Sequence, residues 1–237
     1  MDFGGIIKQS LVDYPGQIAT VLFTRGCNFR CPYCHNGHLL IKPGKADQSY
    51  LSTEELMKFL EERRGFIDAV VISGGEPTLN SKLPGMCQQL KNQGLLVKLD
   101  TNGTNPLMLE ELIKEGLLDY IAMDVKAPLE YSKYLKAAGK ISSEDFLNLL
   151  NSIYLLKRAP IEIEFRTTVV RGLHTPEDII QIARYLMGAK TYSLQQFNPQ
   201  HTLDPGYEEV VPYSKTDLEI MAESCRSFIK KVKVLNI

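Results

Sequence analysis

Three of the five cysteines in this 237-residue chain fall within one short segment, at Cys27, Cys31 and Cys34. Thiolates are soft ligands that select zinc, Cu(I) and iron–sulfur clusters. A closed structural site needs four ligands, and the other two cysteines, Cys87 and Cys225, are distant in sequence. Three thiolates can instead hold a [4Fe–4S] cluster in which one iron has no protein ligand. The spacing therefore predicts an iron–sulfur site with a position open to a small molecule.

Other interpretations of these cysteines remain open. A disulfide framework is disfavoured because the number of cysteines is odd and no apolar signal sequence precedes them. Cys31-Pro32-Tyr33-Cys34 follows a strand-like run and is also typical of a thioredoxin-type redox pair. The additional Cys27, the length of the chain and a loop rather than a helix after Cys34 count against that pair. A zinc site is the third alternative, and Cys87 and Cys225 lie in helical patterns where we expect buried side chains.

The spacing Cys-x3-Cys-x2-Cys resembles that of the radical S-adenosylmethionine (SAM) superfamily. The sequence Cys34-His35-Asn36, and Asp13-Tyr14-Pro15-Gly16 before an apolar run, resemble its glycyl-radical-enzyme activating branch. Within that branch the chain is most similar to the enzymes that activate anaerobic ribonucleoside-triphosphate reductase, followed by those that activate pyruvate formate-lyase. The resemblance implies a [4Fe–4S] cluster on Cys27, Cys31 and Cys34 whose fourth iron is chelated by the amino and carboxylate groups of SAM.

Apolar strand-like runs alternate with helical patterns along the chain. Helix starts are marked by a capping box at Ser52–Glu55 and by a capping residue before proline at Asn105-Pro106 and Thr175-Pro176. Strands are expected at 18–24, 69–73, 95–100, 120–126, 161–170 and 192–198, and 232–236 is a candidate for one more. Six successive strand–helix units imply a parallel sheet with right-handed crossovers, short of a closed barrel. We therefore expect an α/β fold, an open partial TIM-like (β/α)6 barrel, as one domain over residues 1–237 with a cluster loop at 25–38.

Parallel barrels carry their chemistry at the C-terminal ends of the strands. Beyond Cys27, polar residues occur at four of these ends, namely Ser73–Glu76, Asp100–Gly103, Asp124–Lys126 and Gln196–Asn198. In the fifth expected strand, charged and polar residues alternate with apolar ones, which places on one face Glu162, Glu164, Arg166 and Thr168. An apolar exterior covered by helices then directs that face into the lumen.

The resemblance gives roles to three of these strand ends. Gly74-Gly75-Glu76 is similar to the GGE motif, whose backbone accepts hydrogen bonds from the SAM ammonium; a simple strand-to-helix turn is the alternative. Asp124-Val125-Lys126 matches positions that contact the ribose hydroxyls and the carboxylate of SAM, unless its charges form only an internal ion pair. Asp100-Thr101 matches positions that bind a monovalent cation together with Asp124, although backbone amides satisfy such aspartates equally well.

Four further residues complete the expected SAM site. Arg166 offers a bidentate fork to a carboxylate in the lumen, or pairs with a glutamate of its own strand. Tyr33 and His35 flank the last cluster ligand and match residues that touch the adenine, although His35 could instead donate a hydrogen bond to a cluster sulfur. Asn198 falls where the pyruvate formate-lyase activating enzymes have a histidine near SAM.

Composition adds limits to this interpretation. Lys and Arg total 27 against 28 Asp and Glu, so the charge gives no reason to expect nucleic-acid binding. No apolar run approaches the ~18 residues of a membrane span and no targeting segment is visible, so we expect a cytoplasmic protein with reduced thiols and no membrane partner. No cysteine lies between His35 and Ser73, where many activating enzymes insert a ferredoxin-like segment, so we expect one cluster.

The resemblance implies an activase. A low-potential donor such as flavodoxin or ferredoxin reduces the cluster, SAM is cleaved to methionine and a 5′-deoxyadenosyl radical, and the radical takes hydrogen from a backbone glycine of a partner enzyme. The segments Pro128–Lys140 and Pro199–Pro212, rich in polar residues and tyrosines, are the expected docking loops. The alternatives are a radical SAM enzyme acting on a small molecule such as a deazapurine precursor, and a thiol–disulfide module using Cys31 and Cys34.

Overall fold

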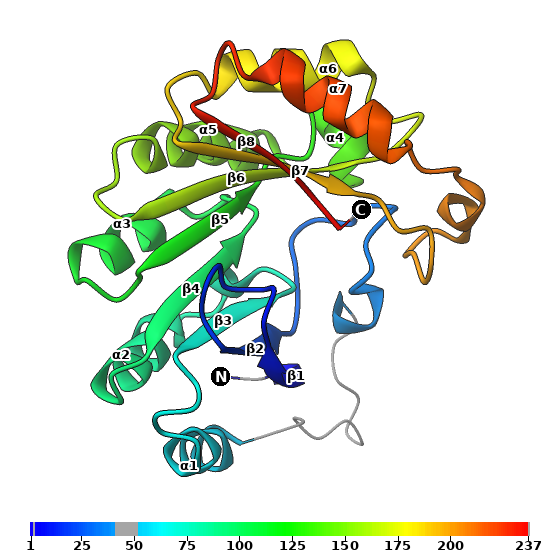
Figure 1. Ribbon diagram of the computed structural model, residues 1–237. Coiled ribbons are helices and arrows are strands. Elements are labelled where there is room, and N and C mark those ends of the chain that lie inside the picture. Colours follow the sequence, from blue (N-terminus) through cyan, green and yellow to red (C-terminus); the bar gives the residue numbers. More distant parts are fainter. Residues whose placement is uncertain (2, 41–51, 237) are drawn as a thin grey trace. The chain divides into compact units, whose positions relative to one another are not determined.

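A computed structural model describes residues 1, 3–40 and 52–236 (Figure 1). The strands are β1 (Phe3–Ser10), β2 (Ala19–Thr24), β3 (Ala69–Gly74), β4 (Leu96–Thr101), β5 (Tyr120–Asp124), β6 (Glu162–Val169), β7 (Thr191–Gln196) and β8 (Lys231–Leu235). The α-helices are α1 (Thr53–Glu62), α2 (Leu83–Asn92), α3 (Pro106–Lys114), α4 (Tyr131–Ala138), α5 (Ser143–Leu156), α6 (Pro176–Tyr185) and α7 (Lys215–Cys225). Short 3₁₀ helices are η1 (Gly37–Leu40), η2 (Pro77–Leu79) and η3 (Pro205–Glu209). In the sheet the strands follow chain order from β1 to β8.

These elements group into two compact units, which we describe separately. The first comprises Met1–Cys27, His38–Thr101 and Leu107–Ile121, and the second comprises Asn28–Gly37, Asn102–Pro106 and Ala122–Ile237. The division falls inside β5, so β1 to β4 belong to the first unit and β6 to β8 to the second. That the chain acts as a single domain stays a prediction.

The first unit is built on β2, β3 and β4, which pair in parallel, with β1 antiparallel on β2. The residues Ala69 to Ile72 of β3 are all inaccessible to solvent. A parallel strand covered on both faces needs such a continuous apolar run, because neither face meets water. The register pairs Thr24 with Gly74, so the C-terminal ends of β2 and β3 lie side by side.

The second unit is built on β6, β7 and β8, which also pair in parallel. Helices α6 and α7 contact each other and lie side by side (Figure 1), and α7 contacts β7 and β8. The apolar stripes of the two helices, including Ile179, Ile182 and Leu218, are fully buried, as are Tyr192 and Leu194 of β7. A helix with one apolar stripe gains stability by covering a sheet face in this way.

Side-chain caps begin several helices, and those of α1 and α6 were predicted from the sequence. Ser52 accepts a hydrogen bond from the N–H of Glu55, whose carboxylate accepts in return from the N–H of Ser52. Reciprocal boxes of the same kind begin α6 and α7, and Ser142 caps α5. Each box satisfies two N–H groups that the first turn of a helix leaves unpaired, which fixes where the helix starts.

Two elements differ from the sequence-based expectation. Strand β1 was not predicted, and the segment Pro128–Lys140, predicted as a docking loop, contains helix α4. Tyr134, Ala137 and Ala138 are buried at helical spacing, so this face of the helix packs inside the second unit. The prediction of a loop there is therefore wrong, and docking of a partner on the segment stays a prediction. The other expected loop, Pro199–Pro212, contains only the short η3.

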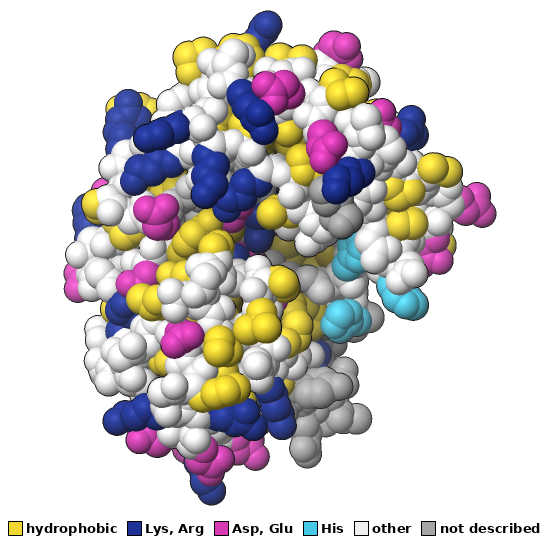
Figure 2. All heavy atoms as spheres, viewed as in Figure 1, with side chains coloured by type: hydrophobic (Ala, Val, Ile, Leu, Met, Phe, Trp, Pro, Cys, Tyr) yellow, Lys and Arg dark blue, Asp and Glu magenta, His cyan; other side chains and the backbone are white. Residues whose placement is uncertain are grey.

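Lys and Arg side chains gather over α5, β6 and β8 on the face shown in Figure 2. Exposed basic residues within these elements, or within two positions of them in sequence, include Arg158, Lys230 and Lys231. Strand β8 is last in the sheet order, and Lys231 and Lys233 alternate along it with valines. Lysines on an edge strand discourage pairing with another chain, because such pairing would remove their charges from water.

Candidate functional site

The three clustered cysteines lie in a segment with a tight turn. None of the three forms a disulfide with another described residue; Cys31 is buried, and Cys27 and Cys34 are partly exposed. The Cys34 N–H donates to the Cys31 carbonyl at 3.0 Å, which closes the turn between them. Cys27 is the last residue of the first unit before this segment, and the other two belong to the second unit.

The end of α4 anchors this segment within the second unit. The Arg30 N–H donates to the Ala138 carbonyl at 2.8 Å. A Cβ added at Gly139 would lie 2.0 Å from the Arg30 carbonyl oxygen, and the φ of Gly139 is +67°. Only glycine allows this close approach and this backbone conformation. This contact was not predicted from the sequence, although a glycine that ends a helical pattern was a signal for it.

The donor set suits an iron–sulfur cluster. Three cysteines of one segment, none of them in a disulfide with a described residue, would supply three thiolates, and a reduced cluster bound there would provide an electron to a sulfonium ligand. Among the described residues, no three His, Cys, Asp or Glu side chains converge as ligands of one metal ion do. Thiolates on a [4Fe–4S] cubane each bind a different iron, so they need not converge on one point. Cys27, Cys31 and Cys34 therefore fit as the residues that would hold the cluster.

In the first unit, Gly74 and Gly75 end β3 where its backbone touches the end of β2. The Gly75 N–H donates to the Thr24 carbonyl at 2.9 Å, and the Glu76 N–H donates to the Gly26 carbonyl at 2.8 Å. A Cβ added at Gly75 would lie 1.9 Å from the Gly26 oxygen, and one at Gly74 would lie 2.5 Å from the Thr24 nitrogen. Both glycines are therefore needed for the contact between the two backbones.

The side chain of Glu76 is buried within the first unit. Its Oε1 accepts hydrogen bonds from the Thr78 N–H at 3.1 Å, the Thr78 hydroxyl at 2.6 Å and the Thr101 hydroxyl at 2.7 Å. The carboxylate thus joins the ends of β3 and β4. The backbone of the Gly74-Gly75-Glu76 motif is then the part that can meet a ligand, and its contact with SAM stays a prediction.

Asp100 forms an ion pair with a lysine of its own strand, Lys98. Its Oδ2 accepts from the Ser73 hydroxyl at 3.0 Å, and the Lys98 Nζ lies 3.2 Å from its Oδ1. Lys98 is 3% exposed and also donates to the Asp13 carbonyl. The role of this lysine was not predicted, although period two along a strand places it on the same face as Asp100. The monovalent cation expected beside Asp100 and Thr101 stays a prediction.

In the second unit, Asp124 lies between two cations. The Arg166 Nε donates to its Oδ1 at 3.0 Å, and the Lys126 Nζ donates to its Oδ2 at 2.9 Å. Burial alone would raise the pKa of Asp124, but Arg166 and Lys126 outweigh burial and hold that pKa at about 2. Burial also opposes the charged form of Lys126, yet the Asp124 carboxylate raises the pKa of Lys126 well above its ordinary value. The three side chains are therefore all ionised at neutral pH, with two positive charges against one negative.

The other charged residues of β6 lie apart from this group. Glu164 is buried, and it accepts a hydrogen bond from the Ser193 hydroxyl while the Lys233 Nζ lies 3.6 Å away. Glu162 is exposed at the start of the strand. The charged residues of β6 therefore differ in burial, and among these three only Arg166 pairs with Asp124 of β5.

Tyr33 is buried among aromatic rings of the second unit. Its ring centroid lies 6.4 Å from those of Phe197 and Tyr207. Burial raises the pKa of Tyr33 well above its ordinary value, and the Cys31 thiol adds to this, whereas Lys126 lowers it. The Tyr33 hydroxyl is a buried polar atom with no hydrogen-bond partner among the described residues. A buried hydroxyl of this kind is a candidate contact for a bound ligand.

His35 packs against Phe197 of the same aromatic group, whereas the side chain of Asn198 does not take part in it. The His35 ring lies edge-on to Phe197, with centroids 6.2 Å apart. Partial burial lowers the pKa of His35, and a hydrogen bond with the Asn198 backbone partly offsets this. The Asn198 side chain is exposed and accepts from the Gln200 N–H at 3.0 Å, so it supports a turn. Sequence analysis did not single out Phe197, which contacts both predicted adenine-binding residues.

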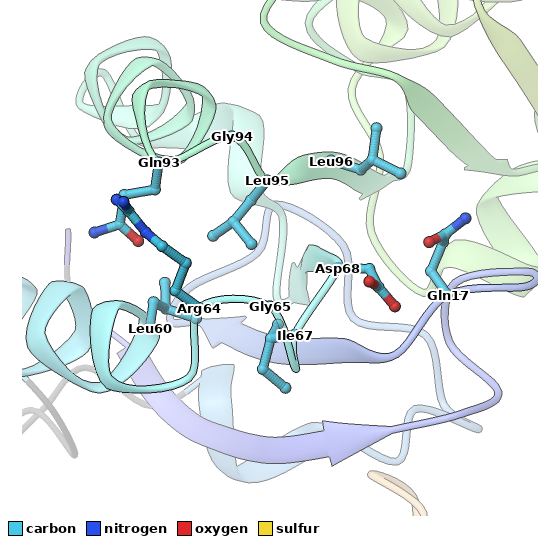
Figure 3. A pocket seen from close by; sticks show the side chains of 10 residues that line it. All are labelled: Gln17, Leu60, Arg64, Gly65, Ile67, Asp68, Gln93, Gly94, Leu95 and Leu96. Atoms are coloured by element: carbon cyan, nitrogen blue, oxygen red, sulfur yellow. The ribbon is translucent and has the colours of Figure 1, made fainter.

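A separate pocket of about 370 Å³ lies in the first unit (Figure 3). Its lining includes Arg64 and Asp68, which precede β3, and Gln93 and Leu95, which precede β4. It therefore lies at the N-terminal ends of these strands, opposite the ends that carry the predicted site residues. It includes none of those residues.

Residues 21–186 match the radical SAM superfamily. The chain is 34% identical over 236 residues to a Methanocaldococcus jannaschii protein named "putative glycyl-radical enzyme activating enzyme", covering 98% of this chain and 95% of that one. It is 30% identical over 235 residues to the pyruvate formate-lyase-activating enzyme of Clostridium pasteurianum, covering 95% and 94%. In fold it is similar to a radical SAM methyltransferase from Sphaerobacter thermophilus, with a TM-score of 0.69, 15% identity, and coverage of 93% of this chain and 67% of that chain.

The chain therefore belongs to the radical SAM superfamily, and within it to the glycyl-radical enzyme activating enzymes. Enzymes of this family are of the oxidoreductase type and use a [4Fe–4S] cluster and SAM. The eight-stranded, mostly parallel sheet and the likeness in fold confirm the predicted α/β class with a partial TIM-like barrel. Membership also favours the cluster over the thiol–disulfide alternative at Cys31 and Cys34.

Proposed function

We propose that this protein forms a glycyl radical on a partner enzyme similar to anaerobic ribonucleotide reductase. The observation that supports this most is the group of side chains in the second unit, in which Asp124 is held between Lys126 and Arg166 close to the buried Tyr33. SAM carries a carboxylate, two ribose hydroxyls and an adenine, and this group offers a partner to each. Similarity over nearly the whole length to a protein named for such activation adds to the support.

Each side chain has a role that follows from its charge. The ionised Asp124 accepts hydrogen bonds from the ribose hydroxyls, and the Lys126 ammonium attracts the SAM carboxylate. The aromatic faces of Tyr33 and His35 lie against the adenine. The backbone of the Gly74-Gly75-Glu76 motif accepts from the SAM ammonium, as its similarity to the GGE motif implies.

The partner docks, in this proposal, on the segment Pro199–Pro212. Val211 of that segment is 71% exposed, so an apolar side chain there is accessible to a partner. Tyr207 of the same segment contacts the ring of Tyr33. A partner loop that presses on this segment would therefore reach the adenine side of the SAM site, and would shield the reacting groups from water.

The electron donor is a low-potential protein such as flavodoxin or ferredoxin. Cys27 and Cys34 are partly exposed, so a cluster on them lies near the surface where such a donor can approach. None of the helices in the described residues is long and apolar enough to cross a bilayer. Replacing chemical reductant with each reduced donor protein, and measuring cluster reduction by electron paramagnetic resonance, tests this part of the proposal.

The decisive experiment uses the cluster-loaded protein, SAM, reductant and an anaerobic ribonucleotide reductase under anaerobic conditions. We expect a glycyl radical signal in the reductase and transfer of deuterium from its labelled glycine to 5′-deoxyadenosine. Pyruvate formate-lyase serves as the second candidate partner, and the Cys27→Ala variant as the inactive control. If a labelled small molecule gives its deuterium to 5′-deoxyadenosine efficiently without any partner protein, the small-molecule alternative replaces this proposal.

A further inference from the structure

Lys126 lies just outside β5, yet both polar groups of its backbone are bound by side chains of the second unit. Its N–H donates to the Tyr134 hydroxyl at 3.1 Å. Its carbonyl oxygen lies 2.7 Å from the Nε2 of His174. Tyr134 of α4 and His174 of the turn after β6 therefore bind the backbone of Lys126, one at its N–H and the other at its carbonyl oxygen. A residue held in this way cannot rotate its backbone without breaking a buried hydrogen bond.

The protonation of His174 follows from its two partners. The Val170 N–H donates to the Nδ1 of His174 at 3.0 Å, so that nitrogen must carry a lone pair. The single proton of the neutral ring is then on Nε2, which donates it to the Lys126 carbonyl. Burial lowers the pKa of His174, and the nearby Lys126 ammonium acts in the same direction, whereas the hydrogen bond to the Lys126 carbonyl and the Asp178 carboxylate raise it.

The fold holds His174 firmly. The ring is 1% exposed, and the His174 N–H donates to the Val170 carbonyl at 2.9 Å, which closes a turn just after β6. The His174 carbonyl accepts from the Tyr213 hydroxyl at 2.8 Å. Thr175, the next residue, is the N-cap of α6. The imidazole is therefore fixed by the elements on both sides of it in sequence.

Tyr134 is equally fixed. It is fully buried in α4, and its ring packs edge-on against Phe29 and Phe146, with centroids 6.3 Å and 5.7 Å away. Burial raises the pKa of Tyr134, which keeps the phenol protonated and able to accept the Lys126 N–H through its oxygen. The same helix ends at the contact with Arg30, so α4 supports both the cysteine segment and Lys126.

We propose that His174 and Tyr134 are positioning residues that clamp the Lys126 backbone so that the side chains of Asp124 and Lys126 meet SAM in one fixed arrangement. This rests on the proposed function, in which these two side chains bind SAM. Neither His174 nor Tyr134 contacts the ligand in this proposal. Both act through Lys126, as the partners of metal ligands act through the ligands they orient.

The test compares His174→Leu with His174→Gln in cluster-loaded protein. Gln carries an oxygen that can accept from Val170 and an N–H that can donate to Lys126, whereas Leu can do neither. We expect the dissociation constant for SAM to rise about tenfold or more in His174→Leu and to stay within about threefold in His174→Gln, with iron content unchanged in both. Tyr134→Phe should weaken SAM binding in the same direction, and the exposed Tyr154→Phe should not.

A second measurement examines the clamp without SAM. In protein whose histidines are labelled with nitrogen-15, the neutral His174 ring should carry its proton on Nε2, and its pKa should lie below the ordinary value. A proton on Nδ1, or a pKa at or above the ordinary value, would overturn the clamp even where His174→Leu fails to fold. If Lys126→Met weakens SAM binding and His174→Leu does not, the clamp is wrong and the proposed SAM site stands. If Lys126→Met and Asp124→Asn both bind SAM as the wild type does, the site itself is wrong.

Discussion

The Arg166 Nε lies 3.0 Å from the Asp124 Oδ1, and this pair joins the C-terminal halves of two neighbouring strands of the sheet. The remaining oxygen of Asp124 is bound by Lys126. A carboxylate bound at both oxygens is fixed in direction and stays ionised, because protonation would weaken two ion pairs. The pair therefore sets both the geometry and the charge of the proposed SAM site.

The Asp124 pKa of about 2 predicts how stability depends on pH. A carboxyl whose pKa is lowered on folding stabilises the protein above its unfolded-state pKa of about 3.9, and this stability is lost as the pH falls through the folded-state pKa. The wild type should therefore be more stable than Asp124→Asn by a constant amount from pH 5 to pH 8. The difference should shrink by roughly 2 kcal/mol between pH 4 and pH 2. Urea unfolding of both proteins at a series of pH values measures it, and a difference that declines already between pH 7 and pH 5 would contradict the assigned pKa.

The cysteines give a prediction about iron content. Cys27→Ala, Cys31→Ala and Cys34→Ala should each lose the cluster after anaerobic reconstitution, because two thiolates do not hold a cubane. Cys87 and Cys225 are fully buried and free, and they serve as matched controls. Their alanine variants should keep about four irons per chain, with stability lowered only by the lost packing of one sulfur. A full cluster in Cys27→Ala would contradict the three-ligand assignment.

Gly75 offers a prediction about the junction of β2 and β3. A Cβ at this position would lie 1.9 Å from the Gly26 carbonyl oxygen, so Gly75→Ala must push apart two paired backbones. We expect a loss of about 3 kcal/mol or more in the free energy of unfolding and poor cluster assembly, because Gly26 directly precedes Cys27.

Gly85 is the matched control for this change. It lies in α2, and an added Cβ there meets nothing within 4 Å. Gly85→Ala should therefore stabilise the protein by about 0.5–1 kcal/mol, since alanine favours a helix more than glycine does. Urea unfolding of both variants gives the two changes in the free energy of unfolding. If Gly75→Ala is no more destabilising than Gly85→Ala, local movement relieves the predicted clash.

The helices, the parallel strands and the cysteine segment could be predicted from sequence because their signals are local. Ser52 and Thr175 cap helices through residues three positions away, and the buried run of β3 is apolar without interruption. Strand β1 was missed because its glycines and its half-exposed residues do not alternate cleanly, and its pairing with β2 is irregular at two points. Propensity alone predicts such an edge strand poorly, since pairing and packing decide it.

The residues that hold the site residues in place could not be predicted from the sequence, for a different reason. His174 holds Lys126 across 48 positions of sequence, and Gly139 meets Arg30 across more than 100. No spacing rule connects such residues, because only the folded second unit brings them together. Residues that would touch SAM could be predicted through the resemblance, whereas residues that orient them could not.

Lys98 and Asp100 provide the last prediction. Their side chains are 4% and 14% exposed, the Nζ of Lys98 lies 3.2 Å from the Asp100 Oδ1, and the same ammonium lies 5.5 Å from the centre of the Tyr120 ring. Replacing one member of a buried ion pair leaves a charge without its counter-ion, which costs about 3–5 kcal/mol. Lys98→Met and Asp100→Asn should each destabilise the first unit by an amount of this order.

The double variant separates the pair from its surroundings. If the two charges interact directly, Lys98→Met combined with Asp100→Asn should cost less than the sum of the single changes, by about 1–3 kcal/mol. Urea unfolding of the wild type, the two single variants and the double variant at pH 7 measures this double-mutant cycle.

Strictly additive losses would mean that Asp100 draws its stabilising charge from another source, such as the predicted monovalent cation. In that case, exchanging potassium for tetramethylammonium should destabilise the wild type and leave Asp100→Asn unaffected, whereas a direct pair with Lys98 makes both proteins indifferent to the exchange.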